Sequence, residues 1–248
     1  MALVEYAVHE GVGHITLNRP DRANAFDLET ATTLAAVVER VGHDPQVRSV
    51  VLSGTGPRFC AGGDVASFAA ASDQSAYIHR LAIELDKAFH ALSALDKPVA
   101  AAVHGAVAGA GLALMLTCDI VVAEPQTRFL FAYPGIGLTP DCGLSYLLPR
   151  AIGQQRALSF ALLGIAASAE DAAGWGLVTE VADDPQGRAF EVARAWANGP
   201  AGAFGQVRRL LRARDLDRGA MGLEEARTIS EMSRGLEART LISRFTNS

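Results

Sequence analysis

The chain contains few of the residues from which disulfide frameworks, metal centres and nucleic-acid surfaces are built. It has three cysteines and none of them forms a CxxC pair, so a disulfide framework is excluded and a reducing compartment fits. The six histidines show no spacing typical of metal ligands, which predicts no zinc or iron site. The net charge of −5 leaves no basic excess to replace the counterions of a nucleic acid, so no nucleic-acid partner is expected.

Targeting and membrane segments are missing as well. Residues 1–6 show no basic region followed by an apolar stretch, which predicts a cytoplasmic protein without a signal peptide. Residues 99–117 are apolar apart from His104 and Thr117, and this run is long enough to suggest a membrane span. Three glycines interrupt it, however, and they favour a buried strand, turn and helix, so no membrane partner is expected.

Arginines gather in one short stretch near the C-terminus. Arg208, Arg209, Arg212 and Arg214 follow one another along an expected helix. The cluster is too short to follow a polyanion, and its spacing indicates a solvated helix face or a local contact with a phosphate.

The sequence does contain a regular alternation of short apolar runs with amphipathic helices. At 248 residues, half of them hydrophobic, the chain can bury one large core. Strands are predicted at residues 3–8, 14–17, 47–52, 99–103 and 120–123, and helices at residues 28–42, behind an Asp27 N-cap, and 75–95. After residue 185 the pattern is wholly helical, with helices predicted at residues 188–197, 204–214 and 223–239. The sequence therefore predicts an α/β body over residues 1–185 and a helical region over residues 186–248.

Two glycine-rich loops are the most informative feature of the chain. Residues 58–64 (RFCAGGD) and 104–111 (HGAVAGAG) each follow a β-like run, and their tips carry tiny side chains or none. Small residues let a substrate approach the main-chain N–H groups, and a helix that starts just after the loop adds positive dipole there. Either loop alone would be read as a tight turn or a close helix contact, but the pair indicates an oxyanion hole.

Together with the CDI run at 118–120, these loops resemble the crotonase (enoyl-CoA hydratase/isomerase) superfamily. Further motifs follow in family order: NRP at 18–20, NAF at 24–26, GLTPD at 137–141, LPR at 148–150, SAEDA at 168–172 and GWGLV at 174–178. The resemblance implies an α/β fold, a crotonase-like spiral of strand-strand-helix repeats with a C-terminal helical region. It also implies an acyl-CoA thioester as substrate and a homotrimer or hexamer. No cofactor is expected beyond the CoA that the substrate carries.

The resemblance also implies roles for single residues around the thioester. The oxyanion donors fall on the backbone amides of Gly63 and Ala110, and Asp64, which follows the first donor, is interpreted as a cap on the next turn. The two glutamates with which the family's hydratases activate water fall on Ala113 and Tyr133. Alanine cannot transfer a proton and tyrosine is a poor base near neutrality, so hydration by two carboxylates is not expected.

Asp141 offers a different chemistry. The PDCG run at 140–143 resembles the isomerase branch, including enzymes that rearrange ring-epoxidised phenylacetyl-CoA, in which the aspartate after proline is the acid/base. One carboxylate suffices for a 1,3-proton shift. The alternative is that Asp141 is only the N-cap of the helix through Leu144. Phe68, Leu138 and Leu144 are candidates for an apolar lining around the acid, or for plain core.

The remaining candidates concern the CoA portion of the substrate. Family matching places Arg22, Ala23 and Ala25 near the nucleotide and pantetheine end, although Arg22 could equally be an ordinary exposed arginine. The set of candidate substrate-binding residues further includes Ala61, Gly63, Asp64 and Tyr133 along the thioester arm, and Phe245 as a cover from the same or a neighbouring subunit. Two alternatives stay open: a hydratase or another enolate chemistry with an unidentified base, and an inactive relative that binds CoA or RNA.

Overall fold

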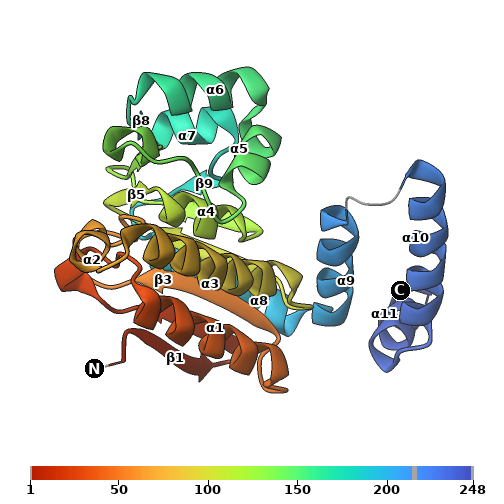
Figure 1. Ribbon diagram of the computed structural model, residues 1–248. Coiled ribbons are helices and arrows are strands. Elements are labelled where there is room, and N and C mark those ends of the chain that lie inside the picture. Colours follow the sequence, from red (N-terminus) through yellow and green to blue (C-terminus); the bar gives the residue numbers. More distant parts are fainter. Residues whose placement is uncertain (1, 214–216, 247–248) are drawn as a thin grey trace.

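The computed structural model describes residues 2–213 and 217–246, which fold into an α/β body with a helical C-terminal region (Figure 1). The larger sheet has the strand order β1 (Val4–His9), β2 (Val12–Leu17), β3 (Ser49–Gly54), β4 (Val99–Val103), β6 (Ile120–Ala123), β9 (Glu180–Val181). All its neighbours pair in parallel except β1 and β2, which form an antiparallel hairpin. A smaller sheet has the order β5 (Ala106–Ala108), β7 (Arg128–Leu130), β8 (Ala167–Ser168). The chain passes from one sheet to the other at β4–β5 and β6–β7, which is the strand-strand-helix repeat expected from the resemblance.

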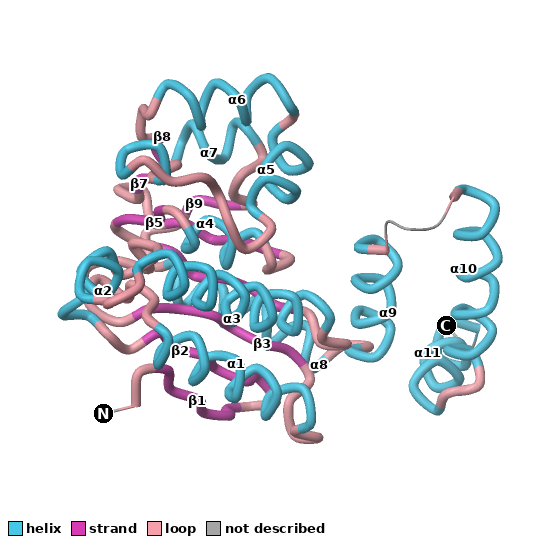
Figure 2. The backbone as a smooth tube through the Cα atoms, in the orientation of Figure 1, coloured by secondary structure: helices cyan, strands magenta, loops and turns pink. Residues whose placement is uncertain are grey.

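Helices cover both faces of the larger sheet and fill the space around the smaller one (Figure 2). They are α1 (Leu28–His43), α2 (Val65–Ala70), α3 (Gln74–Ala94), α4 (Ala110–Leu116), α5 (Leu144–Ile152), α6 (Gln154–Leu163), α7 (Ala169–Trp175), α8 (Pro185–Asn198), α9 (Ala201–Arg212), α10 (Arg218–Ser233) and α11 (Leu236–Thr246), with 3-10 turns at η1 (Pro20–Arg22) and η2 (Tyr133–Ile136).

Side chains alternate between the two faces of the larger sheet, and each face has its own core. Ile15 and Leu52 belong to the main core, which α1 and α3 cover. Their strand neighbour Val51 points to the opposite face, where it packs with Ala189 and Ala193 of α8. Because successive strand residues face opposite sides, the mainly apolar strands are buried on both faces. The helix α8 therefore packs on the body, although it lies beyond the expected boundary at residue 185.

Several expectations from the sequence are confirmed. Asp27 caps α1 by accepting a hydrogen bond from the amide of Thr30, and α1 and α3 begin and end within one residue of their expected positions. The apolar run at 99–117 consists of β4, β5 and α4. None of the helices in the described part of the chain combines the length and the apolar character that a membrane span requires.

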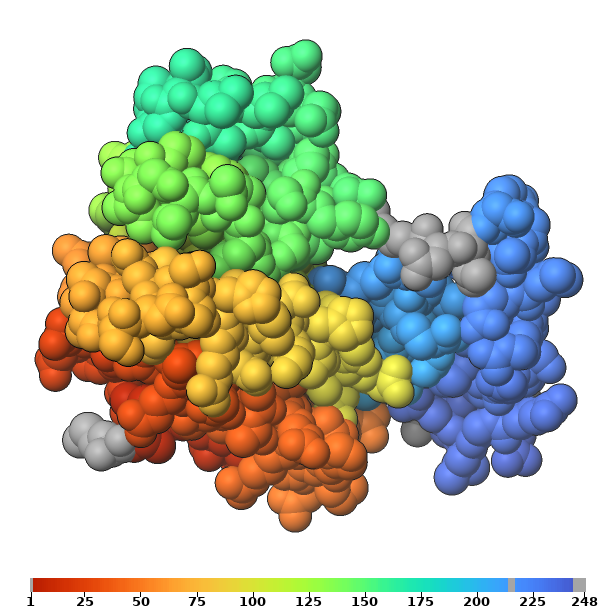
Figure 3. Space-filling model, in the orientation of Figure 1, coloured from red at the N-terminus to blue at the C-terminus, as the bar shows by residue number. Residues whose placement is uncertain are grey.

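The prediction of a single helix over residues 223–239 is wrong, because the structure has two helices there. α10 ends at Ser233 and α11 starts at Leu236. Gly235 lies at the junction, and glycine is among the residues least favourable to a helix interior. The two helices form a lobe beside α9 and the body (Figures 1 and 3).

The basic cluster also differs from the expectation of a solvated face or a phosphate contact. Arg208 is 6% exposed, and its guanidinium donates to Asp119 at 2.6 Å and to the carbonyl oxygens of Leu92, Ser93 and Leu95 at the end of α3. Arg214 lies outside the described residues.

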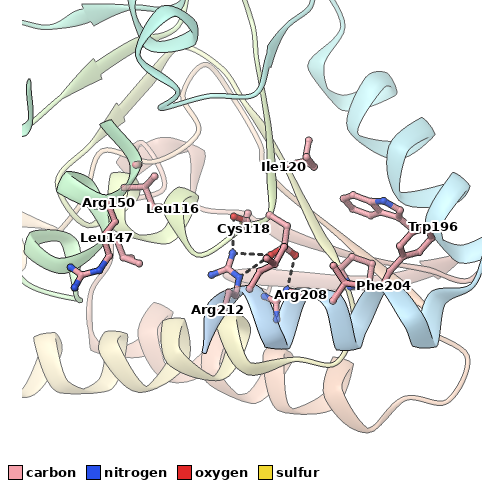
Figure 4. Close-up of a pocket in the computed structure, with 14 residues that line it drawn as sticks. Leu116, Cys118, Ile120, Leu147, Arg150, Trp196, Phe204, Arg208 and Arg212 are labelled. Atoms are coloured by element: carbon pink, nitrogen blue, oxygen red, sulfur yellow. Dashed lines mark hydrogen bonds and ion pairs between the residues drawn. The ribbon is translucent and has the colours of Figure 1, made fainter. Parts of the chain in front are cut away.

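Arg212 completes this contact between α9 and the body. It donates to the other oxygen of Asp119 at 2.9 Å and to the carbonyl oxygens of Thr117 and Cys118, just beyond α4. Figure 4 shows both arginines reaching from α9 to the same carboxylate. Asp119 and both arginines line a largely apolar groove of about 410 Å³. Cations are favourable at the C-terminal ends of helices, where carbonyl groups lack partners. The two arginines therefore attach α9 to the ends of α3 and α4.

We expect Arg208→Met to lower the free energy of unfolding by about 3 kcal/mol, because it removes a buried charge and leaves its acceptors unpaired. Arg209→Met is the matched control on the same helix: Arg209 is partly exposed and pairs with Glu224, so its loss should cost about 1 kcal/mol or less. Chemical denaturation of both variants measures the difference, and equal costs would contradict the role given to Arg208.

Candidate active site

The two glycine-rich loops meet through their backbones. The amide of Cys60 donates to the carbonyl of Ala106 at 3.2 Å, and the amide of Ala108 donates to the carbonyl of Cys60 at 3.0 Å. This is a parallel bridge in which Cys60 faces Val107. The first loop is thereby an extension of the smaller sheet, next to β5.

Close approach of the loops requires glycine at position 62. Gly62 has a φ of +95°, and a methyl group there would lie 2.9 Å from the carbonyl oxygen of Ala108 and 3.3 Å from the amide nitrogen of Ala110. Both the positive φ and the short contact exclude a larger residue without rearrangement.

The two expected oxyanion donors line the same cavity. Gly63 follows the bridged Cys60 by three residues, and Ala110 follows the bridged Val107 by three residues. Ala110 is the first residue of α4, so its amide has no acceptor within the helix. Both residues face one cavity of about 300 Å³. Two amides in such positions can receive the negative charge that develops on a carbonyl oxygen.

An ion-pair network fixes the position of the first loop. Arg19 bridges Asp27 and Asp64 with contacts of 2.8 Å to each. Asp64 also caps α2 by accepting from the amides of Ala66 and Ser67, as expected from the sequence. Burial alone would raise the pKa of Asp64, but hydrogen bonds from Arg19 and the Ser67 amide outweigh it and hold this pKa below its usual range.

The cavity has walls on three sides. Both loops form one side, α2 and α3 form the second, and the segment from η2 to Asp141 forms the third. The lining side chains are mostly apolar and include Val65, Phe68, Ile78, Leu81, Ala82, Leu85, Ile136 and Leu138. A mostly apolar lining lowers the local dielectric constant and so strengthens the electrostatic interactions within the cavity.

Asp141 faces this cavity and does not cap a helix. The following helix α5 begins at Leu144 behind an N-cap at Gly143, and no side chain caps it. The alternative that Asp141 is merely an N-cap is therefore wrong. Cys142 and Gly143 both have positive φ, at 51° and 73°, and this turn separates the Asp141 side chain from the helix.

Tyr133 is the direct partner of that carboxylate. Its hydroxyl donates to Oδ1 of Asp141 at 2.6 Å. Burial raises the pKa of the Tyr133 phenol, and the charge of Asp141 raises it further. The phenol therefore stays protonated and acts as a donor, which agrees with the expectation that it is a poor base.

Of the remaining candidate residues, some line this cavity and others are buried behind it. Phe68 packs against Gly63 so closely that a methyl group on Gly63 would lie 2.5 Å from its ring. Leu138 lines the cavity, whereas Leu144 and Ala113 are fully buried and do not line it.

Arg22, Ala23 and Ala25, which were matched to the CoA end of the substrate, lie beside the first loop and do not line the cavity. The carbonyl of Ala23 accepts from the amide of Ala61 at 3.0 Å, and Ala61 is at the cavity wall. Ala25 is buried next to this contact, and Arg22 is exposed at the end of η1. Phe245 belongs to α11, but its side chain lies outside the described part of the chain.

Helix α3 contributes site residues that the sequence did not single out. Its apolar stripe reads as core, and Leu81 and Leu85 are indeed buried. The same residues also form the cavity wall, together with Ile78 and His79. Helical periodicity detects a buried face but not a cavity within it, so only the spatial arrangement reveals His79. In residues 2–213 and 217–246, no group of three or more His, Cys, Asp or Glu side chains could hold a metal ion.

Comparison with known proteins defines the class. The family model for enoyl-CoA hydratase/isomerase matches residues 7–234. The chain therefore belongs to the enoyl-CoA hydratase/isomerase family, within the crotonase superfamily.

Some relatives are named as isomerases and others as hydratases. The chain is 39% identical over 211 residues to 1,2-epoxyphenylacetyl-CoA isomerase of Escherichia coli, covering 82% of this chain and 79% of the relative. It is 35% identical over 237 residues to the probable enoyl-CoA hydratase EchA14 of Mycobacterium tuberculosis, covering 96% and 91%. A crystal structure from Mycobacterium abscessus, described as an enoyl-CoA hydratase/isomerase, superposes with a TM-score of 0.92 at 36% identity, covering 98% of this chain and 96% of the other.

We expect Gly62→Ala to cost about 1–3 kcal/mol of unfolding free energy, because alanine strains the backbone at this φ and also meets the second loop. Gly164→Ala is the control for φ alone, since Gly164 has a φ of +64° and open space around it. Thermal or chemical denaturation should show a lower stability for Gly62→Ala than for the control. If the two variants are equally stable, the contact between the loops does not constrain position 62.

Proposed function

We propose that this protein is an enoyl-CoA double-bond isomerase with Asp141 as its acid/base. The observation that carries the proposal is the composition of the cavity. Among the described residues that line it, Asp141 is the one carboxylate, and it shares the cavity with the oxyanion candidates Gly63 and Ala110. The relationship to 1,2-epoxyphenylacetyl-CoA isomerase supports an isomerase.

In the proposed reaction, the thioester carbonyl oxygen accepts hydrogen bonds from the amides of Gly63 and Ala110. Asp141 removes a proton from C2 of a 3-enoyl thioester, and the electron pair of that C–H bond moves into a dienolate whose charge lies on the thioester oxygen. The same carboxyl returns the proton to C4, which leaves the double bond between C2 and C3. Preorganised donors of this kind lower the activation barrier by about 3–4 kcal/mol each. A single base both removes and returns the proton, so no second acid or base is needed.

The described lining of the cavity holds no second carboxylate, which supports isomerisation over hydration. The two positions matched to the hydratase glutamates hold Ala113, which is fully buried, and Tyr133, which is engaged with Asp141. The alternative is a hydratase or another enolate reaction, and it is supported by the relative named as an enoyl-CoA hydratase. Product mass separates the two, since isomerisation leaves the mass unchanged and hydration adds one water.

The CoA part of the substrate is proposed to lie along the first loop. Ala61 lines the cavity, and Ala23 and Ala25 sit beside it, with Arg22 exposed where a phosphate could reach it. Phe245 is proposed to cover the bound CoA. A CoA- or RNA-binding protein without turnover is the third reading, and titration with CoA esters and with RNA, beside a turnover assay, would reveal it.

Asp141→Asn should lower turnover of 3-hexenoyl-CoA by about a hundredfold to ten-thousandfold, because the amide cannot accept the C2 proton. Binding of the CoA ester, measured by calorimetry, should change little, since the oxyanion amides remain. The assay follows the ultraviolet absorbance of the conjugated product.

Asp73→Asn is the control, since Asp73 caps α3 outside the cavity and asparagine caps equally well. Full turnover by Asp141→Asn would refute Asp141 as the base.

We also propose a homotrimer or a hexamer as the working assembly. Large apolar side chains are exposed on the C-terminal helices and on α6: Leu162, Leu211, Leu223 and Leu236 are each 76% exposed. Extended apolar exposure is typical of surfaces that bind another subunit. Analytical ultracentrifugation should give a mass of three or six chains, and a monomer at micromolar concentration would contradict the proposal.

A further inference from the structure

Tyr133 lies between the second glycine-rich loop and Asp141. It is 8% exposed and lines the cavity at the start of η2. Its hydroxyl donates to Oδ1 of Asp141 at 2.6 Å. Its ring lies beside the second glycine-rich loop, where a methyl group on Gly109 would be 3.9 Å from the ring carbon that carries the hydroxyl. One side chain thus spans from the loop of the Ala110 amide to the carboxylate.

The ring of Tyr133 is held in place by aromatic packing. It lies 5.4 Å from the ring of Phe131. Phe131 packs edge-on against Phe160 at 6.4 Å, and Phe160 packs in the same way against Trp175 at 5.7 Å. These contacts connect the tyrosine to α6 and α7, which are outside the cavity. A buried ring in a row of aromatic contacts has little freedom to rotate, so its hydroxyl is a fixed point for the carboxylate.

The surroundings of Asp141 make this hydrogen bond important. Among the described residues that line the cavity, the titratable side chains besides Asp141 are His79 and Tyr133, and none is a lysine or an arginine. Burial raises the pKa of Cys142, as does the charge of Asp141, so the thiol is neutral. Tyr133 is therefore a neutral donor to the carboxylate, and the described lining of the cavity offers no lysine or arginine for an ion pair.

We propose that Tyr133 is a positioning residue for proton transfer. Its hydroxyl holds Oδ1 of Asp141 and thereby fixes the orientation of the carboxylate that accepts and returns the substrate proton. Its ring sets the distance between that carboxylate and the loop of the oxyanion donor Ala110. This inference rests on the proposed isomerase function, and it assigns Tyr133 no proton transfer of its own.

Tyr133→Phe tests the inference, because it removes the hydroxyl and keeps the ring. With 3-hexenoyl-CoA as probe, kcat should fall by about tenfold to a hundredfold, as expected for the loss of a hydrogen bond to a charged group, while KM changes little. In heavy water, the fraction of product that keeps the substrate's own proton should fall by roughly twofold or more, since a loosely held carboxyl exchanges before it returns the proton. A purely structural role would not move this fraction.

The chain provides a matched control. Tyr6 makes the same kind of hydrogen bond to a carboxylate oxygen of Asp44 at 2.8 Å, and neither residue lines the cavity. Tyr6→Phe should therefore leave both kcat and the retained-proton fraction at the wild-type values. A ring-fluorinated tyrosine at position 133, which keeps the donor, should restore turnover to within about threefold of wild type.

The outcomes separate this inference from the proposed function. Wild-type kcat and proton retention in Tyr133→Phe, together with an inactive Asp141→Asn, would overturn the role of Tyr133 and leave Asp141 as the base. Full turnover in Asp141→Asn would instead refute the proposed function itself. If Tyr133→Phe fails to fold, the fluorinated variant decides: loss of kcat despite an intact donor also overturns the inference.

Discussion

The geometry of the site depends on the approach of two backbones to hydrogen-bonding distance. Cys60 and Val107 form a parallel bridge, and side chains near it have almost no space: a methyl group at Gly111 would lie 2.6 Å from the carbonyl oxygen of Cys60. Small residues are therefore a steric requirement of this contact. Because Gly63 and Ala110 each follow the bridge by three residues, the bridge brings their amides to the same cavity.

The smaller sheet then fixes the position of the acid/base candidate, Asp141, relative to these amides. β5 lies within the second glycine-rich loop and pairs in parallel with β7, and the amide of Gly109 donates to the carbonyl of Leu130 at the end of β7. The chain continues from β7 to Tyr133 and Asp141. Strand pairing thus fixes the segment that carries the carboxylate to the loop of the oxyanion candidate Ala110, and Tyr133 lies beside that loop while its hydroxyl donates to the carboxylate.

The sequence predicts those parts of the molecule that local pattern determines. Asp27 marks the start of α1, β4 and β6 have their expected bounds, and both glycine-rich loops were identified from their composition. Contacts between distant segments were not predictable. Arg208 looks like a surface residue in sequence, because nothing local reveals that Asp119, 89 residues away, is its partner. In the same way, His79 shares an amphipathic helix with core residues, and only the tertiary arrangement places it at the cavity.

The partner of Asp141 also bears on which reaction this cavity favours. Activation of water requires a group to hold the water and a group to take its proton. The raised pKa of Tyr133 removes it as a base, and its hydroxyl is already committed to Asp141. Under the proposed function, the one carboxylate of the described lining serves as both acceptor and donor of the proton. A reaction that takes a proton from one carbon and returns it to another suits that arrangement, because it leaves the carboxyl in its starting state after each turnover.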